Sequence, residues 1–205
     1  MTESCRTSNN NVTTIKSMDG FFRMVPQADE SSEPLQLFRQ FKLATSTWLE
    51  FREKLEAATN DGSRNLKVVL FIRHGEGLHN EAIRLPHTVW YPRREEQMTT
   101  KHQGGDGTRC PINLTELRMK FPAVDFSALV DEEDVLWTTD HRESAEEIQT
   151  RAKEFLTELF RTIPERHVAV VTHFGFIEAL CAATLGMKVK AGKCEVVPLV
   201  LEQLA

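Results

Sequence analysis

LKVVLFIRHGEGLHN, residues 66–80, is the most informative stretch in this sequence of 205 residues. Residues 66–72 are apolar apart from Lys67 and rich in β-branched side chains. A short and nearly continuous apolar run of this kind is typical of a strand that is buried on both faces of a sheet. The run ends at Arg73, His74 and Gly75, so polar groups stand at the carboxyl end of the strand, where α/β sheets bind their ligands.

A second strand of the same kind is expected at residues 167–172, HVAVVT. It runs directly into His173, Phe174 and Gly175. If the two strands are parallel neighbours, their carboxyl ends meet at one edge of the sheet, and His74 and His173 face each other across one pocket.

Amphipathic helices are expected around these strands. They are expected at residues 35–58, 144–163 and 176–185. Two capping boxes support them, Thr47 with Glu50 and Ser144 with Glu147, because each pairs a hydroxyl with a glutamate three residues later. Gly186 would end the third helix, since glycine readily adopts the left-handed conformation of a helix C-terminus.

Buried strands that alternate with amphipathic helices predict an α/β fold. We expect a three-layer sandwich, in which helices flank a mostly parallel central sheet. Residues 194–201, CEVVPLVL, would add a last strand at a sheet edge, because Pro198 cannot donate to a ladder. Residues 1–15 are polar and predict a disordered tail, so residues 16–205 would form a single domain.

The composition narrows the classes of function. A net charge of −5 and a pI near 5.8 lack the basic footprint of a dedicated nucleic-acid binder. No apolar run approaches the roughly 20 residues of a membrane helix, and the first residues contain no apolar signal segment. The cysteines, Cys5, Cys110, Cys181 and Cys194, are widely spaced, which favours free thiols. We therefore expect a protein of the cytoplasm or the nucleus that binds neither nucleic acid nor a membrane.

The residues after the two strands suit phosphoryl transfer. Neutral imidazole is a good nucleophile, which fits His74. The guanidinium of Arg73 matches the oxygens of a phosphate group, and Asn80 can donate a further hydrogen bond. Gly75 lets the backbone approach an anion closely, and His173 can stabilise the charge that develops on the transferring group.

Together, these motifs resemble those of the histidine phosphatase superfamily, also called phosphoglycerate-mutase-like proteins. Within it, the likeness is to the phosphomutase-like phosphatases of fungi and plants. The segments that carry it are residues 20–22, 48–55, 67–80, 115–137, 142–156 and 164–176, with Cys194-Glu195. The resemblance therefore extends over most of residues 18–200.

The resemblance implies a role for each motif residue. Arg73 and Asn80 would bind phosphate, and His173 would be a histidine of the pocket. His74 would be the nucleophile, forming a phosphohistidine that water then hydrolyses. Neither a metal nor an organic cofactor is implied, and the partner would be a small phosphorylated metabolite.

The chain departs from the family pattern between residues 81 and 111. The family normally has a second phosphate-binding arginine there, in a Ser-Pro-Leu-x-Arg turn, and a glutamate that donates a proton. The available substitutes are Arg93, Arg94 or Arg109 for the guanidinium, and Glu95, Glu96, Asp106 or Glu143 for the acid. Arg142 and Glu143 align with a family segment near the pocket, so we predict that they bind substrate. Glu143 fits the start of a helix equally well.

The sequence thus predicts a phosphatase that hydrolyses a small phosphorylated metabolite. Phosphoglycerate mutase-type transfer is the alternative among enzymes. If the chain is not an active enzyme, the alternative is a catalytically weak relative that binds phosphorylated ligands. The absence of the Ser-Pro-Leu-x-Arg turn favours this alternative. The short central region is consistent with a truncated gene product as well as with an evolved minimal form, and the oligomeric state stays open.

Overall fold

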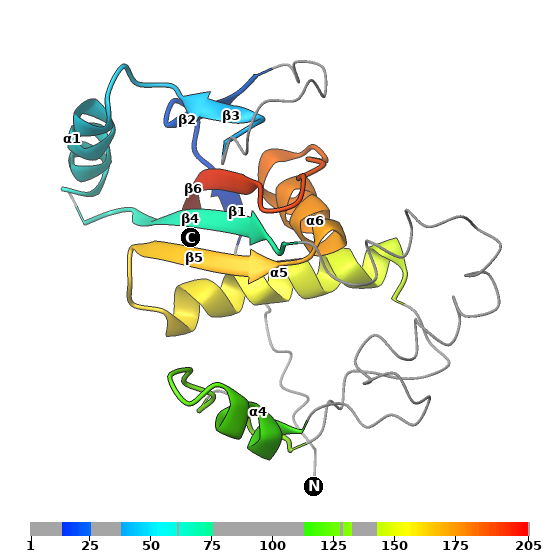
Figure 1. Ribbon diagram of the computed structural model, residues 1–205. Coiled ribbons are helices and arrows are strands. Elements are labelled where there is room, and N and C mark those ends of the chain that lie inside the picture. Colours follow the sequence, from blue (N-terminus) through cyan, green and yellow to red (C-terminus); the bar gives the residue numbers. More distant parts are fainter. Residues whose placement is uncertain are drawn as a thin grey trace, which may run out of the picture. The chain divides into compact units, whose positions relative to one another are not determined.

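In the computed structural model, the residues that are described are 14–25, 38–60, 62–75, 113–127, 129–132 and 143–204 (Figure 1). The chain divides into two compact units, one of Met1–Gly75 with Ser144–Ala205 and the other of Glu76–Glu143. The single domain expected for residues 16–205 therefore stays a prediction.

A four-stranded sheet forms the centre of the first unit, in the strand order β1-β6-β4-β5 (Figure 1). Its strands are β1 (Thr14–Ser17), β4 (Asn65–Arg73), β5 (His167–Thr172) and β6 (Val196–Leu204). β4 and β5 are parallel, whereas β6 runs antiparallel to both β1 and β4. A separate two-stranded sheet consists of the antiparallel strands β2 (Phe22–Met24) and β3 (Phe41–Leu43).

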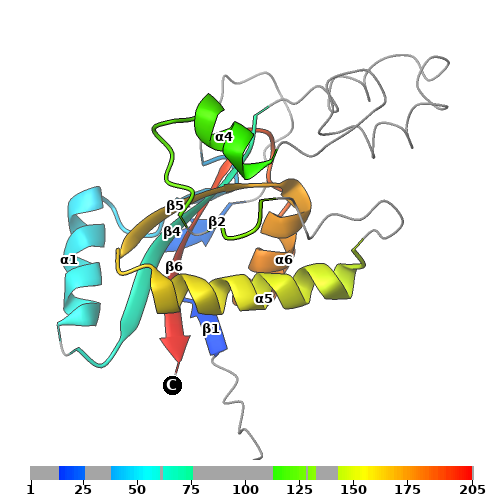
Figure 2. The ribbon, with the colours of Figure 1, turned by 90° about the horizontal axis from the view of Figure 1, so that it is seen from below.

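Helices pack on both faces of the four-stranded sheet (Figure 1, Figure 2). They are α1 (Trp48–Thr59), α5 (Ala145–Thr162) and α6 (Phe174–Leu185). Because successive side chains of a strand point to opposite faces, Val69 and Phe71 are buried in the core formed with α5 and α6, whereas Leu66 and Val68 pack with α1. Burial of one such side chain contributes about 1.5–3 kcal/mol.

The α/β class that the sequence predicts is confirmed. The mostly parallel sheet of a three-layer sandwich is not confirmed, because the described sheet is mixed. The reason lies in residues 186–195, which follow α6 and carry the chain back to the carboxyl end of β4. There Arg73 N donates to Glu195 O at 3.0 Å, and β6 then has to run in the opposite direction to β4.

β6 is an inner strand, which corrects the expectation that Pro198 marks a sheet edge. Pro198 lies opposite Leu70 of β4, while β1 pairs only with residues 201–204 of β6. At Pro198 the strand therefore has β4 on one side and has not yet reached the residues that pair with β1. A proline at this position therefore removes no hydrogen bond from the ladder between β6 and β1.

The first helix is shorter than its sequence pattern. The helical pattern was expected from residue 35, but residues 41–43 form β3, and α1 begins at Trp48. Thr47 is the N-cap residue, and its side chain accepts a hydrogen bond from Glu50 N at 3.1 Å. The capping pair therefore marks the start of the helix better than the apolar period does.

The N-terminal strand begins within the segment that composition assigned to a polar tail. Thr14 pairs with Leu204 of β6, and Ile15 is buried in the core. The rest of the expected tail, residues 1–13, lies outside the described residues. Burial of one apolar side chain among polar neighbours is a weaker signal than a continuous apolar run.

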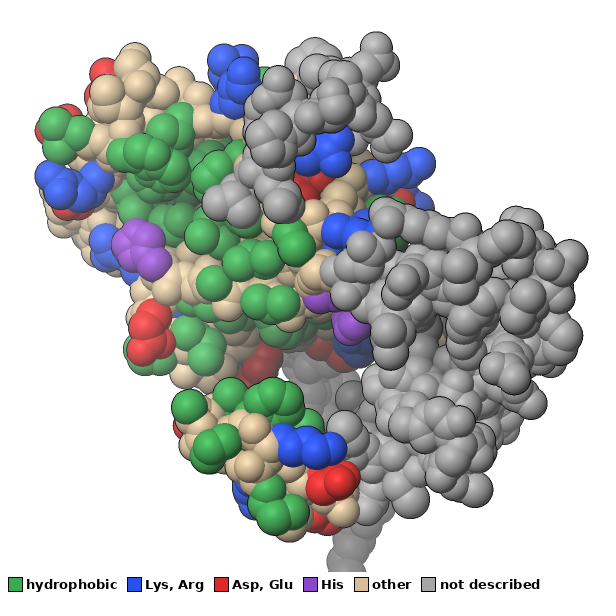
Figure 3. All heavy atoms as spheres, in the orientation of Figure 1, with side chains coloured by type: hydrophobic (Ala, Val, Ile, Leu, Met, Phe, Trp, Pro, Cys, Tyr) green, Lys and Arg blue, Asp and Glu red, His purple; other side chains and the backbone are tan. Residues whose placement is uncertain are grey.

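β5 lies at one edge of the described sheet, with β1 at the other, and the two faces of β5 differ. Val168 and Val170 pack against the core that α5 and α6 form, whereas His167, Ala169 and Val171 are exposed, Val171 by 68%. Hydrophobic side chains accordingly gather at the surface over β4 and β5 (Figure 3). The edge strand is thus anchored to the core through one face.

The second unit contains α4 (Leu114–Lys120). Asn113 is its N-cap residue, and the Asn113 side chain accepts a hydrogen bond from Glu116 N at 2.9 Å. Among the helices that the structure describes, none is both long enough and apolar enough to cross a membrane.

The N-terminus of α5 allows a direct test of the predicted cap. Ser144 Oγ accepts from Glu147 N at 3.2 Å, and Glu147 Oε2 accepts from Ser144 N at 2.7 Å. Ser144→Ala removes the first bond and should lower the free energy of unfolding by about 1 kcal/mol, measured by urea denaturation. Thr150→Ala is the matched control, because the Thr150 hydroxyl bonds Glu146 O within the same helix. An equal loss in both variants would show that the cap makes no special contribution.

Candidate active site

The parallel register of β4 and β5 brings His74 and His173 together. Arg73 pairs with Thr172 at the end of the ladder, so the two histidines are the next residues on adjacent strands. His74 N donates to Thr172 O at 2.9 Å, which extends the ladder by one bond. The imidazole rings lie 4.7 Å apart between centroids, at an interplanar angle of 61°. Two histidines that are distant in the sequence are thus in contact.

The imidazole of His74 is held in one tautomer. Its Nδ1 lies 2.7 Å from the carbonyl oxygen of Gly75. A carbonyl oxygen only accepts hydrogen bonds, so Nδ1 carries the proton, and the lone pair of the neutral ring is then on Nε2. Nε2 is therefore the basic nitrogen of the half-buried ring in its neutral form.

The guanidinium of Arg73 is held from two sides. Nη1 donates to Ala191 O at 2.9 Å, and Cζ lies 5.3 Å from the centroid of the Phe174 ring. The Nε atom is buried and has no hydrogen-bond partner among the described residues. A buried N–H group without an acceptor costs about 1–3 kcal/mol. An anionic ligand such as phosphate would supply the acceptor.

α6 begins directly at the pair of histidines. His173 is its N-cap residue, and the N-terminal end of a helix presents backbone N–H groups and the positive end of the helix dipole. Arg151 of α5 adds a positive charge, since its Cζ lies 4.6 Å from the ring centroid of Phe176 in the first turn of α6. Both features favour an anion at this end of the sheet.

Residues 190–195 approach His74 from the C-terminal side of the chain. Cys194 adopts φ 56°, a left-handed conformation that costs a residue other than glycine roughly 1–2 kcal/mol. Cys194 N lies 3.5 Å from His74 O, and Cys194 Sγ lies 3.5 Å from the position that a Cβ on Gly75 would take. Backbone strain is therefore stored beside the histidine pair, as is common at functional sites.

Several predicted site residues fall outside the described part of the chain. They are Asn80 and Arg142 and, among the substitutes, Arg93, Arg94, Arg109, Glu95, Glu96 and Asp106. Glu143 is described and exposed, and it directly precedes Ser144, the N-cap residue of α5. It belongs to the second unit. Its role in binding substrate stays a prediction.

The described residues contain no group of three or more His, Cys, Asp or Glu side chains that could hold a metal ion. The expectation that the protein needs no cofactor stays a prediction.

Sequence reasoning missed the contribution of residues 190–195. The acceptor for Arg73 is the backbone carbonyl of Ala191, which carries no signal of residue type. Glu195 entered only as part of the family resemblance. An acidic residue directly before the apolar run Val196–Leu201 was the one local signal that could have identified it.

Residues 114–199 match the family described as the histidine phosphatase superfamily (branch 1). The resemblance to histidine phosphatases is confirmed. The matched segment includes His173 and Glu195, and it begins after His74. The histidine phosphatase match therefore supports the second strand motif directly, whereas the role predicted for His74 lies outside the matched segment.

Three curated proteins of Arabidopsis thaliana are similar to parts of the chain. Phosphoglycerate mutase-like protein 1 is 46% identical over 82 residues, which are 40% of this chain and 29% of that relative. Phosphoglycerate mutase-like protein 2 is 48% identical over 65 residues, 32% of this chain and 19% of the relative. A further phosphoglycerate mutase-like protein is 39% identical over 71 residues, 35% of this chain and 26% of the relative. The matches span less than a third of each relative, and no solved structure shows a significant match.

Two free thiols of this histidine phosphatase-like chain should differ in reactivity. Cys181 is completely buried, and burial raises the pKa of its thiol to about 12, with the charge of Glu178 adding to the effect. At pH 8 only about one such thiol in 10⁴ is ionised, and the thiolate is the reactive species. Cys194 is half-buried beside Gly75.

Iodoacetamide should therefore label Cys194 of the native chain well before Cys181, as followed by peptide mass spectrometry. Denaturation should equalise the two rates, which provides the control. Equal rates in the native chain would contradict the burial of Cys181.

Proposed function

We propose that this chain is a phosphatase that hydrolyses a small phosphorylated metabolite through a phosphohistidine on His74. The observation that carries the proposal is the contact between the His74 and His173 rings, with the His74 tautomer set by Gly75 O. The buried Nε of Arg73 supports it, because a phosphate oxygen would be the acceptor that this atom lacks among the described residues. The match to the histidine phosphatase superfamily supports the same class of chemistry.

In the proposed reaction, His74 Nε2 attacks phosphorus, so that a P–N bond forms and the P–O bond to the leaving group breaks. Arg73 and His173 donate to the phosphoryl oxygens, on which negative charge is concentrated. The leaving oxygen takes a proton from a carboxylic acid, for which the sequence offers Glu95, Glu96, Asp106 and Glu143. Water then gives a proton to that carboxylate and attacks phosphorus, the P–N bond breaks, and inorganic phosphate leaves with His74 restored.

Two alternatives have specific support. The relatives are named phosphoglycerate mutase-like, so transfer to a second hydroxyl in place of water is the alternative at the same site. A catalytically weak relative that binds phosphate is favoured by the absence of a Ser-Pro-Leu-x-Arg turn from the sequence. Loss of a general acid costs about 10²–10⁴-fold in rate, and loss of a charge-stabilising donor about 10²–10³-fold. A chain with both losses would bind phosphate and turn over very slowly.

Hydrolysis of p-nitrophenyl phosphate tests the proposal, because its leaving group departs as a phenolate without an acid. His74→Ala should lower the rate at least about 10³-fold, since loss of a covalent nucleophile typically costs that much or more. Wild-type chain quenched in alkali, in which the P–N bond survives, should carry phosphate on the peptide that contains His74, as detected by mass spectrometry.

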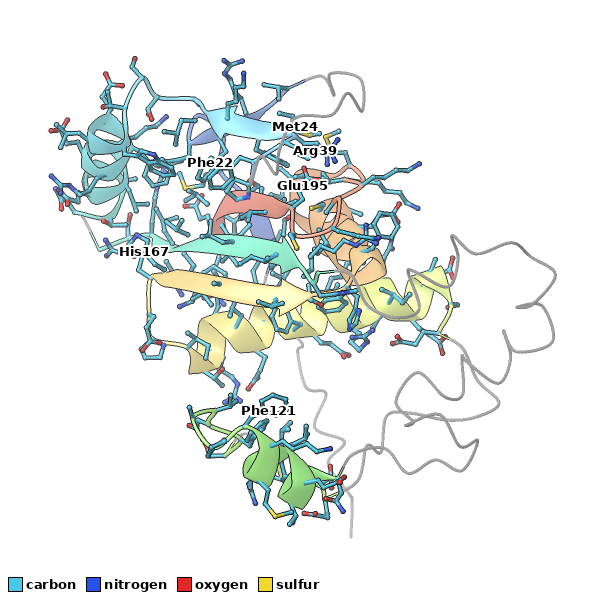
Figure 4. The ribbon with its side chains drawn as sticks, viewed as in Figure 1. Phe22, Met24, Arg39, Phe121, His167 and Glu195 are labelled. Atoms are coloured by element: carbon cyan, nitrogen blue, oxygen red, sulfur yellow. The ribbon has the colours of Figure 1, made fainter. Side chains whose placement is uncertain are left out.

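His167→Ala is the matched control for His74→Ala. His167 is exposed at the start of β5, at the opposite end of the strand from His173 (Figure 4). Its replacement should leave hydrolysis unchanged. Wild-type rates in His74→Ala, or a folded wild-type chain without activity, would contradict the phosphohistidine mechanism. A chain that binds phosphate without turnover would support the alternative of a catalytically weak relative.

A further inference from the structure

Residues 190–195 contain a buried carboxylate that the proposed mechanism does not use. Glu195 is only 2% exposed. Its Oε1 accepts a hydrogen bond from Gln40 Nε2 at 2.9 Å, and its Oε2 accepts from Gly192 N at 2.5 Å. A carboxylate is costly to remove from water, so these two donors are what makes its burial tolerable. Its hydrogen bonds therefore connect Gly192 with Gln40, which comes from a distant part of the sequence.

Gln40, which directly precedes β3, fixes the same segment at a second point. It is 6% exposed, and its Nε2 donates to Lys190 O at 2.8 Å as well as to Glu195. Glu195 N in turn donates to Gly192 O at 3.1 Å. Residues 190, 192 and 195 are thus all held by hydrogen bonds, although the segment belongs to no helix or strand.

The segment is also tightly packed around Gly192. A Cβ at this position would lie 3.1 Å from both Arg39 Nη1 and Glu195 Oε2, which is closer than ordinary contact distances. Arg39 therefore brings a positive charge to the side of Gly192 on which the carboxylate lies (Figure 4). Tight packing around Gly192 therefore adds to the hydrogen bonds that restrain residues 190–195.

These residues carry the contacts that orient Arg73. Ala191 O, which lies between the fixed positions, accepts from Arg73 Nη1 at 2.9 Å. Arg73 N donates to Glu195 O at 3.0 Å. The backbone and the guanidinium of Arg73 are therefore both attached to the segment that Glu195 and Gln40 hold, so a looser segment would give the guanidinium more freedom.

We propose that Glu195 is a positioning residue, which together with Gln40 fixes residues 190–195 and thereby orients the Arg73 guanidinium toward a bound phosphate group. The proposal rests on the proposed function, because the phosphate group is the one that His74 would attack. Glu195 acts through Arg73 and takes no part in proton transfer. Its loss should therefore weaken phosphate binding more than it slows the chemical steps.

Glu195→Gln tests this role. The amide has nearly the same shape but replaces one acceptor oxygen by a donor, so either Gln40 or Gly192 then faces a second donor. The dissociation constant for inorganic phosphate, measured by calorimetry, should rise about tenfold, the equivalent of one hydrogen bond to a charged group. The Nε–Hε resonance of Arg73 should shift. The KM for p-nitrophenyl phosphate should rise more than kcat falls, and the pH profile of kcat should keep its shape.

Two further variants separate positioning from general stability. Gln40→Met removes the hydrogen bonds from Gln40 to Lys190 O and Glu195 while keeping the side-chain volume. It should therefore also weaken phosphate binding and shift the Arg73 resonance. Thr184→Val is the matched control, because Thr184 is equally buried at 5% and bonds Leu180 O within α6. Thermal unfolding of each variant confirms that it is folded, and the Arg73 resonance is assigned with Arg73→Lys.

A resonance that shifts in Glu195→Gln and Gln40→Met but not in Thr184→Val supports the positioning role. An unmoved resonance in both variants, or an equal loss of phosphate affinity in Thr184→Val, would overturn it. A wild-type chain that neither binds phosphate nor hydrolyses the aryl phosphate would contradict the proposed function instead, and the resonance would still decide whether Glu195 positions Arg73.

Discussion

The parallel hydrogen-bond ladder between β4 and β5 sets the geometry of both the core and the candidate site. It ends at Arg73 and Thr172, and the bond from His74 N to Thr172 O fixes the two histidines as the next pair. A slip of one residue would turn every β4 side chain to the other face, and the buried Val69 and Phe71 oppose it. The same register that packs the core therefore holds the imidazole rings at 4.7 Å.

Elements with strong local signals could be predicted from the sequence. β4 and β5 are continuous apolar runs, and the capping box at Ser144 marks the start of α5, so the expected bounds lie within a residue or two of those observed. The direction of β6 could not be predicted, because it depends on where residues 186–195 return the chain. Pro198 shows that one backbone N–H group is missing. It does not show that β1 pairs only with residues 201–204 of β6, beyond the proline.

The candidate site was predictable where residue type and position carry the chemistry, as for His74 and His173 after their strands. The groups that hold Arg73 could not be found in this way. Ala191 contributes a backbone carbonyl, and the bond from Gln40 to Lys190 O joins residues 150 positions apart. Such contacts follow from the tertiary fold. Under our proposal, the phosphate site depends on a carboxylate that does not itself contact phosphate.

Whether one phosphate group contacts both histidines and Arg73 is best measured by nitrogen-15 NMR of the histidine side chains during titration with inorganic phosphate. We predict that the His74 and His173 signals shift with a common dissociation constant, while the signal of His167 stays in place. Arg73→Met should abolish both shifts, because the guanidinium supplies most of the charge that holds the anion. Shifts with different dissociation constants, or none at saturating phosphate, would contradict a shared phosphate site.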